Sequence, residues 1–395
     1  MENFDYCNAT RIIFGRDTQR QVGELTKACA KKVLLHFGGG SIKKSGLYDE
    51  VVASLKAADV VFIELGGVQP NPRLTLVEEG IALCRREGVD FILAVGGGSV
   101  IDSAKAIAMG VKYEGAVWDL YAKGIPVTEA VKVGTVLTIP AAGSESSANT
   151  VLTNEAAGLK LGYGAEVLRP VFSILNPEFC FTLPPCQLGY GVSDMMSHIF
   201  ERYFTHTVKT DLTDALCEAT LRTIMTNARR VREHPTNYDA WAEVVFSGYV
   251  AHKGLLGMGR IQDWACHGME HELSATYDVA HGAGLAVLTP AWMEYVCKQN
   301  IPMFVQFAVN VMGVDASFRD PGSIAREGIR RLRVFYAELG LPATLEDLRI
   351  DSSQLEMMAK KATKIAFGEE RPLGSFKRLF WQDVLAIYHL SQRVD

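Results

Sequence analysis

Short apolar runs that end in glycine alternate with amphipathic stretches through the first 140 residues, and this alternation limits the folds open to the chain. The apolar runs are rich in β-branched residues and too short for helices, as in "KKVLLHFGGGS" and "VDFILAVGGGS". Between them, segments such as "NPRLTLVEEGIALCRREG" repeat apolar residues with the 3.6-residue period of a helix. The pattern predicts a β-α-β-α-β-α-β order, and therefore a parallel sheet covered by helices.

The pattern changes near "LNPEFCFTLPPCQLGYG", residues 175–191, where two consecutive prolines interrupt the chain. Beyond this point strand signals fade, and long helical patterns such as "DALCEATLRTIMTNARRVREH" dominate. A chain of 395 residues also exceeds what one ordinary hydrophobic core accommodates. The sequence therefore predicts an α/β domain over residues 1–184 and an all-α domain over residues 185–395.

Composition narrows the class of protein. The hydrophobic content of 48% and the charged content of 22% are typical of a globular protein in water. The net charge is −5 without a long basic run, which argues against a nucleic-acid partner. No apolar run is long enough to span a membrane, the first residues lack the order of a signal peptide, and the eight cysteines form no CxxC pair. We expect a cytoplasmic protein that acts on a small molecule.

Two predicted strands end in the same kind of glycine-rich turn, "HFGGGS" at 36–41 and "AVGGGS" at 94–99. Glycines between a strand and a helix let the backbone approach a phosphate, which then meets free N–H groups and the positive end of the helix dipole. Neither turn matches GxGxxG or a Walker loop, and glycines there also serve close packing of a helix on a strand. Two such turns at the C-terminal ends of parallel strands nevertheless favour a nucleotide cofactor.

A third predicted strand leads into "TIPAAGSESSANT" at 138–150. The side chains of Thr138, Ser144 and Ser147 offer hydroxyl groups to a ribose, a phosphate or a carboxamide. An ordinary serine-rich loop explains the same residues equally well.

The second half of the chain places histidines and acidic residues at helical spacing. Asp194 and His198 are four residues apart in "GVSDMMSHIFE", and His267 and His271 are four apart in "HGMEHELSATYDVAHG", which also contains His281. Residues four apart share a face of a helix. One carboxylate and three imidazoles suit Fe²⁺ or Zn²⁺ with a position left open for substrate. The spacing also fits ordinary core or surface histidines, because it does not show that the two helices are neighbours.

Four motifs in this order resemble the iron-containing, group III alcohol dehydrogenase family: "VGGGSVIDSAK", "TIPAAGSESS", "GVSDMMSHIFE" and "HGMEHELSATYDVAHG". The segments "FGGGSIKKSGLYDEV", "VQPNPR" and "RPLGSFKRL" resemble its butanol dehydrogenase branch, so the likeness extends over nearly the whole chain. The resemblance implies a Rossmann-like dinucleotide-binding domain and an all-α C-terminal domain, in a dehydroquinate synthase-like architecture. It further implies an NAD(P)-dependent enzyme (EC 1.1.1.-) that transfers a hydride between NAD(P)H and a small primary alcohol or aldehyde such as butanol or butyraldehyde.

The resemblance also assigns roles to single residues. The positions that match the family's metal ligands are Asp194, His198, His267 and His281. His271 matches a histidine close to the nicotinamide and substrate, and it is our candidate for the proton relay because an imidazole titrates near neutral pH. The candidate cofactor-binding positions, which include the first glycine-rich turn, are Gly38, Gly39, Gly40, Ser41, Asn71, Gly97, Gly98, Ser99, Asp102, Thr138, Ser144, Ser147 and Lys160.

These positions indicate which cofactor is preferred and which metals the site can hold. The first turn presents Ser41 with Lys43 and Lys44 nearby, and no acidic residue that would bond a ribose 2′-hydroxyl, so we expect NADP(H) to be preferred over NAD(H). The four ligands suit Fe²⁺ and Zn²⁺ alike. The resemblance suggests a homodimer in which "NATRIIFG" at 8–15 pairs with a second copy, although an ordinary first strand explains this segment as well.

Three other functions are compatible with parts of this pattern. A glycerol dehydrogenase-like enzyme would use zinc and polyols. A lyase that resembles dehydroquinate synthase would need several lysines and arginines at its site, and the stretches around the metal motifs are poor in them. A noncatalytic metal- or nucleotide-binding protein would show no turnover. Consumption of NADPH on addition of butyraldehyde distinguishes these functions from the dehydrogenase.

Overall fold

The computed structural model describes residues 1–317, 320–365 and 368–393, and these divide into two compact units. The α/β unit contains Cys7–Leu183 and Thr236–Val245. The helical unit contains Met1–Tyr6, Pro184–Pro235 and Phe246–Asp395. The chain thus changes unit next to the boundary expected after residue 184, while two short segments join the unit that their sequence position does not suggest.

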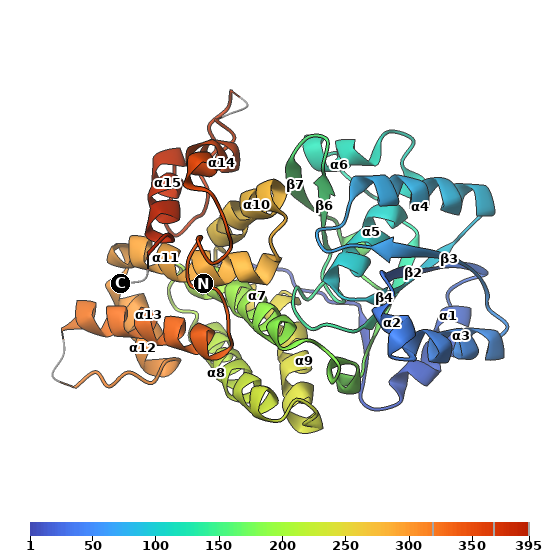
Figure 1. Ribbon diagram of the computed structural model, residues 1–395, viewed down its shortest axis with the longest axis horizontal. Coiled ribbons are helices and arrows are strands. Elements are labelled where there is room, and N and C mark those ends of the chain that lie inside the picture. Colours follow the sequence, from blue (N-terminus) through green and yellow to red (C-terminus); the bar gives the residue numbers. More distant parts are fainter. Residues whose placement is uncertain (318–319, 366–367, 394–395) are drawn as a thin grey trace. The chain divides into compact units, whose positions relative to one another are not determined.

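A six-stranded parallel sheet forms the centre of the α/β unit, in the order β1-β8-β5-β4-β2-β3. Figure 1 labels β2, β3 and β4 of this sheet. Its strands are β1 (Arg11–Phe14), β2 (Lys32–Gly38), β3 (Val61–Val68), β4 (Phe91–Gly96), β5 (Lys132–Leu137) and β8 (Phe172–Leu175). All six residues of β4 are buried between β2 and β5, which explains why "FILAVG" is an unbroken apolar run. The predicted fold class is confirmed. β1 lies at one edge of the sheet, and its pairing with a second copy stays a prediction.

The helices of the α/β unit occupy the predicted amphipathic segments. They are α1 (Val22–Lys27), α2 (Ser41–Lys44), α3 (Leu47–Ala57), α4 (Leu74–Glu87), α5 (Gly98–Lys112) and α6 (Val117–Lys123). An antiparallel hairpin of β6 (Asn149–Asn154) and β7 (Leu159–Gly164) follows the serine-rich loop. The sequence pattern does not predict this hairpin, because its strands are short and carry exposed polar residues.

The order of strands reverses between β2 and β4. β3 lies on one side of β2, whereas β4, the next strand along the chain, lies on the other. The two glycine-rich turns follow β2 and β4, so both are at the reversal point, where open α/β sheets bind their ligands. The serine-rich loop follows β5, the neighbour of β4, and begins at the same edge because parallel strands end on one side.

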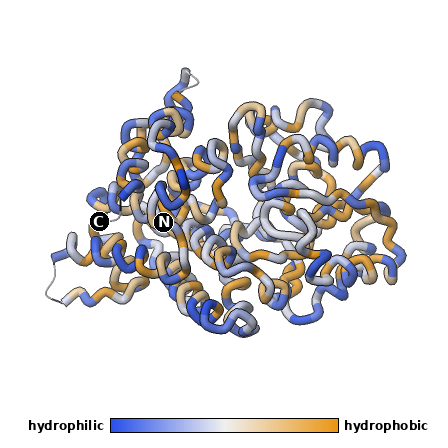
Figure 2. Tube along the Cα trace, in the orientation of Figure 1, coloured by the Kyte–Doolittle hydropathy of each residue, from blue (hydrophilic) through white to orange (hydrophobic). Residues whose placement is uncertain are grey.

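The helical unit has no strand among its described residues, apart from one bridge between Leu373 and Leu379. Its helices are α7 (Pro185–Tyr203), α8 (Asp211–Glu233), α10 (Ala265–Tyr277), α11 (His281–Val296), α12 (Ile301–Asn310), α13 (Pro321–Glu338), α14 (Leu355–Ala362) and α15 (Trp381–Leu390), with the end of α9 (Tyr238–His252). Hydrophobic and hydrophilic residues alternate along α8 and α13, as their sequences predict (Figure 2). Within the described ranges, none of the helices combines the length and the apolar content that a membrane span requires.

Candidate metal centre and cofactor loops

Three packed helices of the helical unit carry the predicted metal ligands. Asp194 and His198 lie on α7, His267 lies in the first turn of α10, and His281 is the first residue of α11. α7 packs on both α10 and α11, and α10 packs on α11. The tertiary structure therefore brings together two sequence motifs that lie about seventy residues apart.

A glycine next to His281 permits the close approach of α11 to α7. A Cβ atom at Gly282 would lie 2.0 Å from the backbone oxygen of Tyr190, a distance that no side chain tolerates. The Ser193 hydroxyl donates a hydrogen bond to the Gly282 carbonyl oxygen and ties the two helices together. The glycine of the "AHG" sequence thus places the start of α11 beside the helix that carries Asp194.

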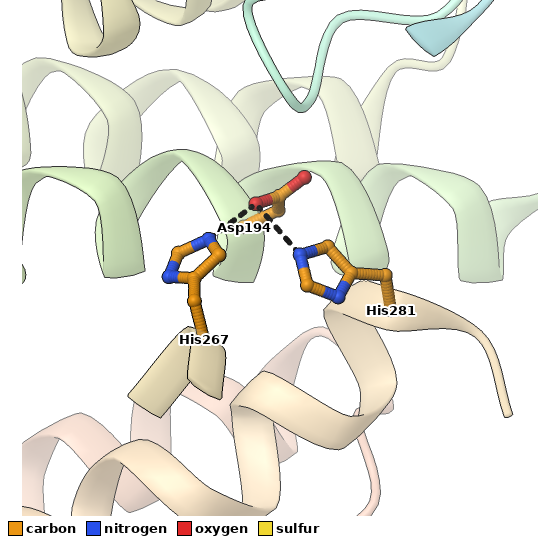
Figure 3. Close-up of side chains that lie close together, drawn as sticks. All are labelled: Asp194, His267 and His281. Atoms are coloured by element: carbon orange, nitrogen blue, oxygen red, sulfur yellow. Dashed lines mark ion pairs between the residues drawn. The ribbon is translucent and has the colours of Figure 1, made fainter. Parts of the chain in front are cut away.

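One carboxylate oxygen of Asp194 faces all three predicted histidine ligands. Asp194 Oδ1 is 3.2 Å from His198 Nδ1, 3.7 Å from His267 Nε2 and 3.8 Å from His281 Nε2. Figure 3 shows His267 and His281 pointing at this oxygen from opposite sides. Asp194, His267 and His281 form a group compact enough to hold one ion, and His198 lies beside it.

The donor atoms of this cluster fit a divalent cation. Asp194 Oδ1, His198 Nδ1 and His267 Nε2 are buried, and none of them makes a hydrogen bond to the part of the chain that the structure describes. Buried polar atoms without a partner are costly, so a ligand is the natural explanation for three of them at one point. Two ligands about 2.1 Å from one ion in a tetrahedral arrangement lie about 3.4 Å apart, close to the observed separations.

Two buried glutamates that were not predicted from the sequence, Glu201 and Glu270, contact the histidines on the side away from Asp194. Glu201 contacts His267 Nδ1 and accepts a hydrogen bond from the His267 backbone N–H at 3.1 Å. Glu270 contacts His281 Nδ1. Glu201 and Glu270 follow His198 and His267 by three residues each, a helical spacing that could have indicated them.

The surroundings of the cluster shift the pKa values of His267 and His198 in opposite directions. Burial disfavours the imidazolium of His267, but the carboxylates of Glu201 and Asp194 outweigh it and raise the pKa of His267 to about 10. Burial, together with the neighbouring His252, holds the pKa of His198 well below its ordinary range. The His198 ring is therefore neutral and suited to ligate a cation.

An aromatic and cationic group shields His198 on its other side. The rings of His198 and His252 have centroids 4.1 Å apart, and Arg202 lies 3.0 Å from His252 Nδ1. The guanidinium of Arg202 lies over the Trp264 ring, 4.6 Å from its centre. Arginine only donates hydrogen bonds, so His252 Nδ1 is the acceptor of this contact.

His271 lies close to this cluster without joining Asp194. It is half-buried on α10, one turn after His267, and its ring centroid is 5.9 Å from that of His281. It forms a second close group with Glu270 and His281. This position allows His271 to act next to the ion while the four predicted ligands hold it.

The candidate cofactor residues lie on the turns that follow β2, β3, β4 and β5, and on the β6–β7 hairpin. Gly40 has a φ of +122°, which only glycine adopts readily. Asn71 is buried, with a φ of 54°. Gly97 caps α5, and a Cβ atom at Gly98 would lie 3.2 Å from that of Ala142, so the first turn of α5 closely approaches the serine-rich loop.

The side chains of Asp102, Ser144 and Ser147 make hydrogen bonds within the α/β unit. Asp102 accepts a hydrogen bond from the Ser144 hydroxyl at 2.5 Å and another from the Val151 N–H at 3.1 Å. Ser147 accepts one from the Asn149 N–H at 3.3 Å. These bonds shape the loop around the candidate phosphate helix, and direct contact of these side chains with a cofactor stays a prediction.

A fully buried lysine, which the sequence analysis did not single out, holds this loop. The Lys105 ammonium on α5 donates to the backbone oxygens of Ser144 at 2.6 Å, Ser147 at 2.9 Å and Asn149 at 2.8 Å. Burial lowers the pKa of Lys105 to about 8. The ammonium thus binds two carbonyls of the loop and one at the start of β6.

Lys105→Met is expected to lower the free energy of unfolding by about 3 kcal/mol, because it leaves the buried carbonyls of Ser144 and Ser147 and the part-buried carbonyl of Asn149 without their donor. The loop should then lose its shape, and the Kd for a nicotinamide cofactor should rise. Urea unfolding and fluorescence titration measure the two effects. Lys112→Met, at an exposed position at the end of the same helix, is the matched control. Unchanged stability of the Lys105 variant would contradict this role.

Apolar residues near the metal motifs divide into two groups. Met195, Met196 and Phe200 are buried on α7, and Phe200 packs against the Phe307 ring, so these three belong to the core. Trp264 is half-buried, and its ring centroid lies 5.3 Å from that of His267. Trp264 is therefore the aromatic residue of this set that adjoins the cluster.

Comparison with known proteins gives matches along the whole chain. The family model "Iron-containing alcohol dehydrogenase" matches residues 9–177, and "Fe-containing alcohol dehydrogenase family, C-terminal" matches residues 190–391. The chain is 45% identical over 391 residues to the probable NADH-dependent butanol dehydrogenase 2 of Bacillus subtilis, with 99% of this chain and 100% of that protein covered. It is 36% identical over 364 residues to the NADPH-dependent aldehyde reductase YqhD of Escherichia coli, covering 91% and 93%. The crystal structure of NADH-dependent butanol dehydrogenase A from Thermotoga maritima has a TM-score of 0.95 and 39% identity, covering 100% of this chain and 99% of that one.

Proposed function

Because this chain belongs to the iron-containing alcohol dehydrogenase family, we propose that it is a metal-dependent alcohol dehydrogenase or aldehyde reductase acting on small primary alcohols and aldehydes such as butanol and butyraldehyde. The observation that carries the proposal is the cluster in which three histidines face one oxygen of Asp194. Relatives with full-length similarity and dehydrogenase or reductase names support the same reaction.

The residues of the helical unit supply the binding and proton-handling parts of the reaction. Asp194, His198, His267 and His281 would hold a divalent ion, Fe²⁺ by family and Zn²⁺ as the alternative. When bound, that ion polarises the substrate oxygen, and the nicotinamide accepts or gives the hydride. His271 takes the hydroxyl proton during alcohol oxidation and returns it during aldehyde reduction.

The residues of the α/β unit bind the cofactor at the reversal point of the sheet. The N-terminus of α5, at Gly97 and Gly98, offers free backbone N–H groups to the pyrophosphate. The loop that Lys105 holds follows β5 at the same edge of the sheet, and it carries the proposed cofactor residues Ser144 and Ser147. In alcohol oxidation, the carbon–hydrogen bond of the alcohol would break with transfer of a hydride to the nicotinamide, and the hydroxyl would lose one proton to His271.

The experiment that tests this function measures NADPH and NADH oxidation with a panel of short aldehydes. The protein is stripped of metal with a chelator and reloaded anaerobically with Fe²⁺ or Zn²⁺. Activity that returns only with metal supports the proposal. A strong preference for glycerol oxidation with zinc would support the polyol enzyme instead, and no oxidation under any loading would leave the lyase or a binding protein.

The cofactor preference is proposed from the first glycine-rich turn. The segment Gly38–Ser41 carries no acidic residue, and the Lys43 ammonium stays next to the turn, 4.6 Å from the centre of the Tyr48 ring. A 2′-phosphate bound at this turn would lie near the Lys43 ammonium, which favours NADP(H). The names of the relatives do not decide the question, because the Bacillus relative is called NADH-dependent and the Escherichia reductase NADPH-dependent.

Lys43→Met is expected to lower kcat/KM for NADPH about tenfold and to leave that for NADH unchanged, because one charge-assisted contact to phosphate is lost. Steady-state kinetics of both cofactors on the wild type and the variant measure this. A wild-type preference for NADH of about tenfold (1.4 kcal/mol) or more would reject the assignment.

A further inference from the structure

Glu201 and Glu270 are buried to an extent that is unusual for carboxylates. Their side chains are 1% and 0% exposed, and neither belongs to the proposed ligand set. Each reaches the Nδ1 atom of a different histidine of the metal cluster, His267 in one case and His281 in the other. A buried carboxylate persists only where donors satisfy it, so these contacts account for both residues.

The two contacts decide which ring nitrogen faces the cluster. An ionised carboxylate only accepts hydrogen bonds, so Nδ1 of each histidine carries the proton and donates it. A ring that binds a metal ion is neutral, and with the proton held on Nδ1 its lone pair is on Nε2. In both rings Nε2 is the atom that points at Asp194 Oδ1 (Figure 3). The carboxylates therefore set the tautomer and the ring orientation at once.

We propose that Glu201 and Glu270 are the positioning residues of the metal centre, each fixing one histidine ligand with Nε2 toward the ion and raising its basicity. This inference rests on the metal-dependent function proposed above. According to this inference, tight metal binding requires two carboxylates besides the four ligands, one on α7 and one on α10.

The two carboxylates should differ in how they tolerate replacement by an amide. Glu201 accepts from two N–H groups, the backbone N–H and Nδ1–H of His267, one on each oxygen. An amide has one oxygen, so Glu201→Gln sets its NH₂ against an N–H donor. Glu270 accepts a hydrogen bond from the Nδ1–H of His281 and another from the Ser274 hydroxyl. That hydroxyl can turn to the Val279 carbonyl oxygen, 3.2 Å away, and accept from the amide instead.

The test is the Kd for Co²⁺ and for Zn²⁺, measured on the full metal-free chain by competition with a chromophoric chelator. Glu201→Gln is expected to weaken binding about 100-fold and Glu270→Gln about 10-fold, the upper and lower ends of the effect of such partners. Glu272→Gln is the matched control. Glu272 is also buried on α10, but it lies two residues beyond Glu270 and so points away from the cluster. The metal Kd of the Glu272→Gln variant should therefore equal that of the wild type.

Two further measurements separate positioning from damage to the fold. The melting temperature of the metal-free Glu270→Gln variant should not fall below that of the metal-free wild type, because the substitution removes a buried charge. Adding Zn²⁺ should raise the melting temperature of the variant by less than it raises that of the wild type. The visible absorption bands of bound Co²⁺ should shift in both variants and stay unchanged in Glu272→Gln.

The outcomes distinguish this inference from the proposed function. A wild-type chain that fails to bind Co²⁺ or Zn²⁺ would overturn the metal-dependent function itself. A wild type that binds metal, with Glu201→Gln and Glu270→Gln binding it equally well, would overturn only the positioning role. Equal weakening in Glu272→Gln would also overturn it, because the loss would then be a general effect of removing a buried carboxylate from the chain.

Discussion

Asp194→Ala is expected to abolish metal binding and to lower kcat/KM by about 1,000-fold or more. Its Oδ1 is the atom that His198, His267 and His281 all face, so its removal takes away the single anion among the proposed ligands. Lewis-acid stabilisation of the transition state is worth several kcal/mol, and each loss of about 1.4 kcal/mol is tenfold in rate.

Metal content by elemental analysis and NAD(P)H oxidation by absorbance measure these two effects. Asp194→Asn preserves the volume of the side chain and should show nearly the same loss, which separates charge from packing. Asp211→Asn, at an exposed position in the first turn of α8, is the control and should retain full activity. Wild-type metal content in Asp194→Ala would contradict the proposed ligand role.

His271→Ala is expected to lower kcat about 100- to 1,000-fold while the metal content stays that of the wild type, because general acid–base catalysis contributes about that much. His271 lies next to His281 and Glu270 but outside the group around Asp194. Free imidazole in the assay should restore part of the activity of the variant, since it can enter the space left by the ring and carry the proton.

The control for this variant is His389→Ala, an exposed histidine on α15 that contacts Gln392. It should leave both kcat and metal content unchanged. Loss of metal from His271→Ala would show that His271 is a ligand, and an unaltered kcat would exclude it from the proton relay.

The fold was predictable because each of its parts leaves a local signature. A central parallel strand such as β4 is buried on both faces, so its sequence is apolar without interruption. α4 shows one apolar face because its other face meets solvent. The β6–β7 hairpin escaped prediction because its strands are only partly buried, unlike a central strand, and their polar residues obscure the alternation.

The candidate site was predictable only in part. Asp194 and His198 share a helix face, and so do His267 and His271, which follows from spacing alone. Spacing places Glu270 on the same face of its helix as His267, but it does not show that Glu270 contacts His281, which lies on another helix. Nor does it show that Asp102 and Ser144 bond to each other, or that Lys105 holds the serine-rich loop.

The sequence by itself determined the order of strands and helices, the glycine-rich turns and the helix faces that carry the candidate ligands. Only the tertiary structure decided which of those faces meet. Local periodicity depends on neighbours a few residues away, whereas the cluster depends on α11 packing against α7 at Gly282, far along the chain from Asp194. Glu201 and Glu270 acquire their partners through the same packing, because a buried carboxylate finds its donors in three dimensions.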